Sequence, residues 1–205
     1  MEKFRSDILE KIRQLFFNQG VRSVSMDDIS RELGLSRKQL NHYFSNKKDL
    51  VRQLLDMERE QFEIIFDTDR FDGDVNAIDI LLMVSKELDD KFTEVSPSMT
   101  YDMKKYYPDI YNKHVEERIE SINEKIRINL EKGIKQGMYR NDLSVELVSR
   151  LYIRRLMDLH DPEIFPADKF SFQTLFEVMF DHFIRGIANE KGIFHYEKQK
   201  NKISL

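Results

Sequence analysis

Residues 25–49, SMDDISRELGLSRKQLNHYFSNKKD, decide the fold, because they encode two short helices separated by a tight turn. In the first helix, Met26, Ile29 and Leu33 recur at helical spacing and form one apolar face. Ser25 precedes this helix and is suited to cap it, since a serine hydroxyl accepts a hydrogen bond from a free backbone N–H. The pattern therefore predicts an amphipathic helix that begins directly after Ser25.

A glycine and a second serine define the turn and the next helix. Gly34 ends the first helix, because glycine adopts the left-handed conformation without a Cβ penalty. Ser36 then begins the segment RKQLNHYF, which buries Leu40 and Phe44. Two helices joined by a three-residue turn that contains glycine form the helix-turn-helix pattern.

The second helix carries the side chains that suit a nucleic acid. Between Leu33 and Lys48 the chain has four basic residues and no acidic one. The first turn of such a helix reaches base edges in the major groove, where Arg and Lys donate to guanine and Gln pairs with adenine. A solvated basic helix of any helical protein is the alternative interpretation. The residues that we expect to contact DNA are Ser25, Ser36, Arg37, Lys38, Gln39, Asn41, His42, Tyr43 and Lys47.

The segment GLSRKQLNHYFSNKKDL, residues 34–50, resembles the DNA-binding signature of TetR-type (TetR/AcrR) transcription regulators. The resemblance extends upstream through GVRSVSMDDIS and covers roughly the first fifty-five residues. This sequence has Asn41 where the family often has Tyr, Lys38 where a small residue is common, and Gln39 where Thr or Ser is common. The change at Asn41 concerns a phosphate contact, and the other two concern which operator is read. The resemblance implies a dimeric regulator with a helical body that binds a small effector.

Composition and charge are those of a soluble helical protein. Charged residues make up 34% and hydrophobic residues 40% of the 205 residues, and there is no cysteine for a disulfide framework. The net charge of −4 is divided unevenly, because residues 1–55 hold eleven Lys/Arg and seven Asp/Glu while the remainder holds twenty-two and thirty. A basic head on an acidic body concentrates phosphate attraction at one end, although chance segregation also explains such small numbers. The N-terminus is amphipathic rather than a signal peptide, so a cytoplasmic location is expected.

Helical periodicity continues along the chain, and the fold class that it predicts is all-α, with about nine helices. We expect three domains: a three-helix DNA-binding head over residues 1–50, an effector-binding and dimerisation body over 51–190, and a frayed tail over 191–205. Besides the helix-turn-helix pair, the expected helices span residues 3–18, 47–66, 75–92, 98–107, 108–134, 144–160 and 169–189.

Two further sites are expected in the body. Aromatic side chains with hydrogen-bonding tips are typical of ligand pockets, although for each one a satisfied core position is the more common role. The candidate effector-binding residues are Phe62, Phe66, Met83, Tyr101, Tyr106, Tyr107, Tyr111 and His114. The last two helices are apolar over most of their circumference, which indicates burial on more than one side, either in one subunit's core or against a second copy. The expected interface residues of the dimer are Leu151, Leu156, Phe176, Phe180, Phe183 and Ile187.

Catalysis and metal binding are not expected. The five histidines, at positions 42, 114, 160, 182 and 195, have no zinc-ligand spacing, and no nucleophile elbow, Walker A sequence or dinucleotide fingerprint is present. No cofactor is expected. The predicted function is that of a homodimeric transcription regulator, a repressor that a small-molecule effector releases from a palindromic operator. A helical protein-interaction module, or a constitutive DNA-binding protein without an effector, is the alternative.

Overall fold

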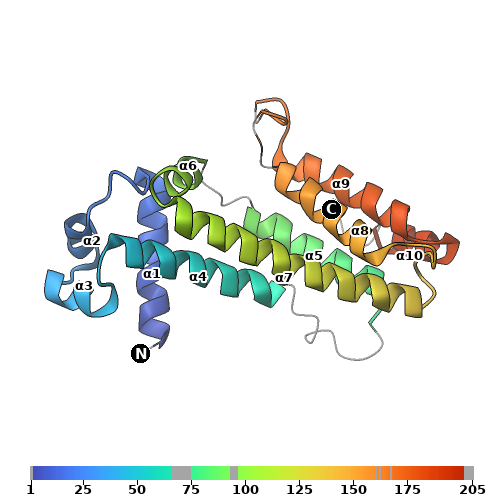
Figure 1. The fold of residues 1–205 in the computed structure, drawn as a ribbon, viewed down its shortest axis with the longest axis horizontal. Helices are drawn as coiled ribbons and strands as arrows, with labels where there is room; N and C mark the ends of the chain where they lie inside the picture. The colour runs from blue at the N-terminus through green and yellow to red at the C-terminus, as the bar shows by residue number, and fades with distance from the viewer. Residues whose placement is uncertain are drawn as a thin grey trace. The chain divides into compact units, whose positions relative to one another are not determined.

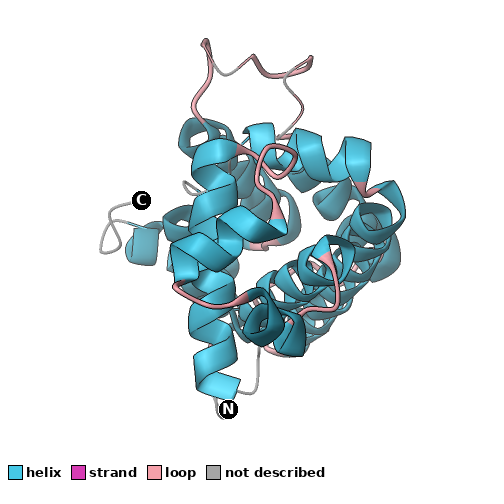
Figure 2. Ribbon diagram, turned by 90° about the vertical axis from the view of Figure 1, so that its left-hand side faces the viewer, coloured by secondary structure: helices cyan, strands magenta, loops and turns pink. Residues whose placement is uncertain are grey.

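The structure, a computed structural model, describes residues 2–65, 75–92, 97–159, 161, 163–166 and 168–200. These residues form ten α-helices, and the described part of the chain contains no strand (Figures 1 and 2). Residues 1–64 and 94–118 pack as one compact unit, unit 1, and residues 65–93 and 119–205 pack as a second, unit 2. The all-α fold predicted from periodicity is confirmed. None of the described helices is long and apolar enough to cross a membrane.

Unit 1 contains the N-terminal helices, which Figure 1 shows in blue and cyan. Its elements are α1 (Glu2–Gln19), α2 (Met26–Leu33), α3 (Arg37–Tyr43), α4 (Lys47–Ile65, up to residue 64), α6 (Pro97–Tyr106) and the start of α7 (Pro108–Lys135). One hydrophobic cluster joins all of these helices. Its buried members are Ile8, Leu9, Ile12, Phe16, Val21, Val24, Ile29, Leu40, Phe44, Leu50, Val51, Leu54, Leu55, Met57, Met99 and Met103.

The packing of unit 1 goes beyond the expected head. Helix α4 and helix α6 share the core of α1–α3, since Leu54, Met99 and Met103 belong to the same buried cluster. The shared core continues past residue 50, and the expected functional boundary there stays a prediction.

Unit 2 contains α5 (Ala77–Phe92), the remainder of α7, α8 (Val145–Asp158), α9 (Phe172–Ile187) and α10 (Glu190–Lys200). Helix α9 packs against both α5 and α8, and the Tyr152 and Phe183 rings lie 4.2 Å apart between centroids. The buried Asn129 of this unit is paired: it donates to the carbonyl of Ala77 and accepts from the Tyr139 hydroxyl, each at 2.9 Å. Such pairing offsets the cost of burying an amide.

Residues 190–200 correct the expectation of a frayed tail, because they form helix α10, which packs against α5 and α9. Asn189 caps its N-terminus, since its side-chain oxygen accepts from the N–H of Gly192 at 3.0 Å. Tyr196 is fully buried and donates to Asp181 at 3.0 Å, and His195 lies 2.8 Å from Asp79. These contacts tie the helix to two others, which an isolated eleven-residue helix would need in order to be stable.

A glycine in α10 allows this close packing. A Cβ built on Gly192 would lie 2.2 Å from the backbone oxygen of Met138, so a side chain there must displace the helix. We expect Gly192→Ala to lower the free energy of unfolding by roughly 1–3 kcal/mol, the range of overpacking substitutions. Chemical denaturation measures the change. The matched control is Gly186→Ala in α9, where a Cβ meets nothing within 4 Å and the higher helix propensity of alanine should add about 0.5–1 kcal/mol. Equal stabilities for the two variants would contradict this packing.

Candidate nucleic-acid interface

The two capped helices predicted from the sequence are present. The Ser25 hydroxyl accepts from the N–H of Asp28 at 3.1 Å, and Asp28 accepts from the N–H of Ser25 at 2.9 Å, which completes a capping box. The hydrogen bonds to Ser25 lower the pKa of the Asp28 carboxyl. Gly34 ends α2 with φ +65°, in the left-handed region that glycine favours. The turn after α2 therefore has a defined direction.

Helix α3 has the same type of cap, and the cap uses a residue that was expected to read bases. The Ser36 hydroxyl accepts from the N–H of Gln39 at 3.2 Å, and the Gln39 side-chain oxygen accepts from the Ser36 N–H at 2.9 Å and from its hydroxyl at 2.8 Å. Bidentate pairing with adenine requires both the oxygen and the nitrogen of the amide. In this conformation Gln39 therefore orients the first turn of α3.

Arg37 and Lys38 are exposed in that first turn, while Leu40 in the same helix is buried. Arg37 does not extend freely, because its Nε lies 3.1 Å from an Asp27 carboxylate oxygen on α2. This partner was not predicted from the sequence. A guanidinium held at Nε still has its terminal nitrogens available as a pair of donors. Asp27 therefore restricts the rotamers of Arg37 without occupying the donors that guanine requires.

The later residues of α3 divide by exposure. Asn41 and His42 are exposed, whereas Tyr43 is half-buried. The Tyr43 ring lies 5.8 Å from the Phe4 ring, and its carbonyl accepts from Gln53 on α4 at 3.3 Å. Tyr43 thus connects α3 to α1 and α4.

Lys47, the expected phosphate contact at the start of α4, is half-buried. Its Nζ lies 3.4 Å from the carbonyl oxygen of Arg22 and 5.9 Å from the centroid of the Phe16 ring. Burial lowers the pKa of the ammonium, and the nearby carboxylates of Asp102 and Asp28 oppose this change. In this conformation Lys47 supports the turn between α1 and α2.

A second support for that turn comes from α6 and was also missed. Asp102 accepts from the backbone N–H of Arg22 at 2.8 Å, although the two residues are eighty positions apart. Gly20 lies in the same turn with φ +79°, and a Cβ there would stand 3.1 Å from the Asp102 carboxylate. No sequence pattern relates an aspartate in a short polar helix to a distant turn.

The expected effector-binding residues are divided between the two units, and their role in one site stays a prediction. Phe66 lies outside the described residues, as does the side chain of Phe62. Met83 belongs to unit 2 and is partly exposed. In unit 1, Tyr101 and Tyr106 are exposed on α6. Tyr107 and Tyr111 are half-buried against the unit 1 core, and His114 is buried.

His114 belongs to a polar cluster that α4 and α7 enclose in unit 1. Its Nδ1 is buried without a hydrogen-bond partner among the described residues. Arg59 on α4 and Glu117 on α7 form an ion pair beside it. Burial lowers the pKa of His114 to about 4, and the positive charges of Arg118 and Arg59 act in the same direction. The imidazole is therefore neutral at physiological pH.

Neutral His114 makes the stability of the protein pH-dependent. Its folded-state pKa of about 4 lies below the unfolded value of 6.5, so its contribution is complete above 6.5 and decreases as the pH falls toward 4. We expect the stability difference between the wild type and His114→Gln to shrink by roughly 2–3 kcal/mol between pH 7 and pH 4.5. Denaturation of both proteins across this pH range isolates the contribution of His114, because every other titratable group is present in both proteins. A difference that stays constant with pH would contradict a buried neutral imidazole.

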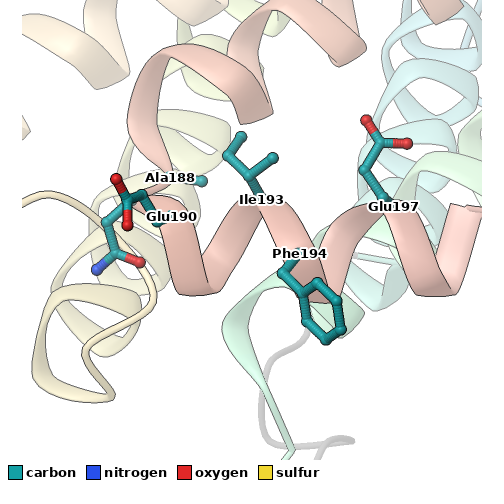
Figure 3. Close-up of a pocket in the computed structure, with 6 residues that line it drawn as sticks. Ala188, Glu190, Ile193, Phe194 and Glu197 are labelled. Atoms are coloured by element: carbon teal, nitrogen blue, oxygen red, sulfur yellow. The ribbon is translucent and has the colours of Figure 1, made fainter.

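A shallow groove of unit 2 lies beside α10 and is lined by Ala188, Asn189, Glu190, Ile193, Phe194 and Glu197. Figure 3 shows that Ile193 and Phe194 leave the helix in different directions, and Phe194 is 74% exposed. None of the expected effector-binding residues lines this groove. Among the described residues, no group of three His, Asp or Glu side chains could hold a metal ion.

The expected dimer residues lie mostly inside unit 2. Leu156, Phe176, Phe180, Phe183 and Ile187 are buried in the core of the chain itself, and only Leu151 is exposed. Leu147 and Leu151, one turn apart on α8, are 61% and 60% exposed, and Val178 on α9 is 52% exposed. Helices α8 and α9 are therefore apolar on two sides, of which the chain covers one.

Comparison with known proteins agrees with the helix-turn-helix. Residues 8–54 match the model of the protein family described as "Bacterial regulatory proteins, tetR family". No curated protein matches the chain.

Solved structures share the whole fold at low sequence identity. A putative TetR-family transcriptional regulator from Mesorhizobium loti is 14% identical with a TM-score of 0.70, and covers 92% of this chain and 98% of its own. A TetR-family transcriptional regulator from Agrobacterium tumefaciens is 18% identical with a TM-score of 0.69, over 92% and 99% of the two chains. A ketosteroid transcriptional regulator from Mycobacterium tuberculosis is 22% identical with a TM-score of 0.58, over 91% and 95%.

Proposed function

We propose that this chain, which has the fold of TetR-family transcription regulators and the tetR-family sequence over residues 8–54, is a DNA-binding repressor that works as a homodimer in the cytoplasm. The observation that carries the proposal is the geometry of α3. Two capping boxes and a left-handed glycine hold this helix, and the exposed Arg37 and Lys38 project from its first turn. A helix presented in this way can place its N-terminal side chains on base edges in the major groove.

Dimerisation follows from the requirements of this type of binding and from the surface of unit 2. One recognition helix reads a few base pairs, so two-fold dimers of such proteins read two half-sites about 34–36 Å apart. The exposed Leu147, Leu151 and Val178 provide an apolar surface on α8 and α9 that a second copy would cover. We place the dimer interface at these three residues, since the other expected interface residues are already buried in the chain.

A small-molecule effector is the third part of the proposal. The buried His114 of unit 1 supports it, because a buried polar atom such as its Nδ1 is seldom left without a partner. An effector releases DNA only if it binds the released state more tightly, by about 5.5 kcal/mol for a shift from 1:99 to 99:1. Loss of operator binding in the presence of a small molecule that also raises the melting temperature would identify such a ligand.

Selection of binding sites from random duplex DNA with the purified protein tests the proposal as a whole. The expected result is a consensus of two inverted half-sites whose centres are about one helical turn, or a multiple of it, apart. Enrichment of a sequence without two-fold symmetry would contradict the dimer. Recovery of random sequence would contradict base reading by α3.

A further inference from the structure

Helix α6 presents a cluster of cationic and aromatic side chains beside the turn that precedes α2. We call it the α6 basic patch, and its members are Arg22, Tyr101, Lys104, Lys105 and Tyr106. All five side chains are exposed, and all belong to unit 1. None of them lies in the helix-turn-helix itself.

Two of the three cations of the patch, Arg22 and Lys105, lie against aromatic rings. Lys105 donates to the Tyr101 hydroxyl at 2.8 Å, and its Nζ lies 5.1 Å and 5.6 Å from the Tyr101 and Tyr106 ring centroids. The Arg22 guanidinium lies over the same Tyr106 ring, at 5.3 Å. Cations stacked on aromatic faces lose less conformational entropy when they bind an anion than cations on free side chains do.

The positive charge of the patch is only partly offset within the described residues. Arg22, Lys104 and Lys105 have no ion-pair partner there. Asp102 is the carboxylate closest in sequence; it accepts from the backbone N–H of Arg22 and keeps its negative charge, so the patch has three cations and one neighbouring carboxylate. This excess of positive charge favours an anionic partner.

The patch is continuous with the candidate DNA surface. Arg22 lies three residues before Ser25, the cap of α2, and its carbonyl oxygen contacts Lys47 at the start of α4. From this continuity and from the charge, we infer that the α6 basic patch binds backbone phosphates of the DNA, so that the DNA contact extends from the helix-turn-helix onto α6. The inference rests on the proposed function. Phosphate contacts of this kind add affinity but no sequence information.

The salt dependence of DNA binding tests the inference. Each phosphate that a protein neutralises contributes about −0.9 to the slope of log K against log salt concentration. We expect Lys104→Gln/Lys105→Gln to reduce the magnitude of this slope by about 1–2, on the operator and on a scrambled duplex alike. The ratio between the DNA affinities of the wild type and the variant should therefore shrink roughly 3- to 12-fold between 50 and 200 mM salt. The ratio between the affinities for the operator and for the scrambled duplex should stay unchanged.

A matched control separates direct contact from net charge. Lys191→Gln/Lys198→Gln removes the same charge from exposed positions of α10 and is expected to leave the slope unchanged. An unchanged slope for the α6 variant, or an equal loss in both variants, would overturn the inference while the wild type still binds the operator. A wild type that binds no DNA would overturn the proposed function instead. The variant Lys104→Arg/Lys105→Arg should have the same slope as the wild type, because arginine keeps the positive charge at both positions.

Discussion

Leu147→Glu/Leu151→Glu is expected to convert the protein from a dimer into a folded monomer and to lower operator affinity by at least about 100-fold. Both leucines are about 60% exposed on one face of α8, so the substitutions should cost the isolated chain little stability. At a two-fold interface each substitution occurs twice, so that four carboxylates would be buried where apolar side chains met before. The affinity falls because two half-sites no longer bind through one rigid dimer.

Light scattering measures the mass of the variant, and titration with labelled operator measures its affinity. The control is Phe194→Glu on α10, where a still more exposed apolar side chain is replaced at a site outside the proposed interface. That variant should remain dimeric and bind the operator normally. A dimeric Leu147→Glu/Leu151→Glu protein, or a monomeric Phe194→Glu protein, would place the interface elsewhere.

Arg37→Ala is expected to remove the preference for one base pair in each half-site. A bidentate contact between arginine and guanine discriminates by about 1–3 kcal/mol, so the wild-type preference of roughly 5- to 150-fold at that position should disappear. Binding to scrambled DNA should change much less, since one of many cations is lost. Affinities for the operator and for its single-base-pair variants measure the preference directly.

Two further substitutions make the result specific to α3. Arg31→Ala removes a cation from the end of α2, where the side chain is 79% exposed, and should leave every base preference as it is. Asp27→Asn weakens the ion pair that restrains Arg37 and should reduce the preference only in part. If Arg37→Ala keeps the full wild-type preference for that base pair, α3 must read bases through other residues.

The sequence predicted the elements of unit 1 because their signals are local. Ser25, Gly34 and Ser36 act on neighbouring backbone groups, and the structure has a cap or a turn at each of them. The use of Gln39 in the second capping box was also readable, since serine followed three residues later by glutamine is the sequence signature of that motif. The interpretation of Gln39 as a base-reading residue overlooked this competing local role.

Contacts between distant segments were not predictable in the same way. Nothing in a polar helix identifies Asp102 as the partner of the turn at Arg22, and a lysine at a helix start does not reveal that its ammonium turns inward. Helical periodicity showed that α8 and α9 are apolar on two sides, but it does not say which side the same chain covers. Leu156 and Phe180 were therefore assigned to a dimer interface, although they lie in the core.

Helix α10 shows the same limit. Its cap, Asn189, is a recognisable local signal, whereas its stability depends on Tyr196 and His195 reaching two aspartates on other helices. A sequence with a weak apolar face and many charges is typical of a frayed terminus, and only the contacts with the two aspartates distinguish this helix from one.

The central claim is that the exposed first turn of α3 reads a DNA sequence. The most direct measurement is the ratio between the affinities of the wild-type protein for its selected operator and for a scrambled duplex of the same length and composition, at about 150 mM salt. Sequence-specific regulators bind their sites on the order of 10³-fold or more tightly than other DNA, and we expect a ratio in that range. A ratio close to one, with strong salt dependence on both duplexes, would contradict the claim and leave only a basic surface that binds any DNA.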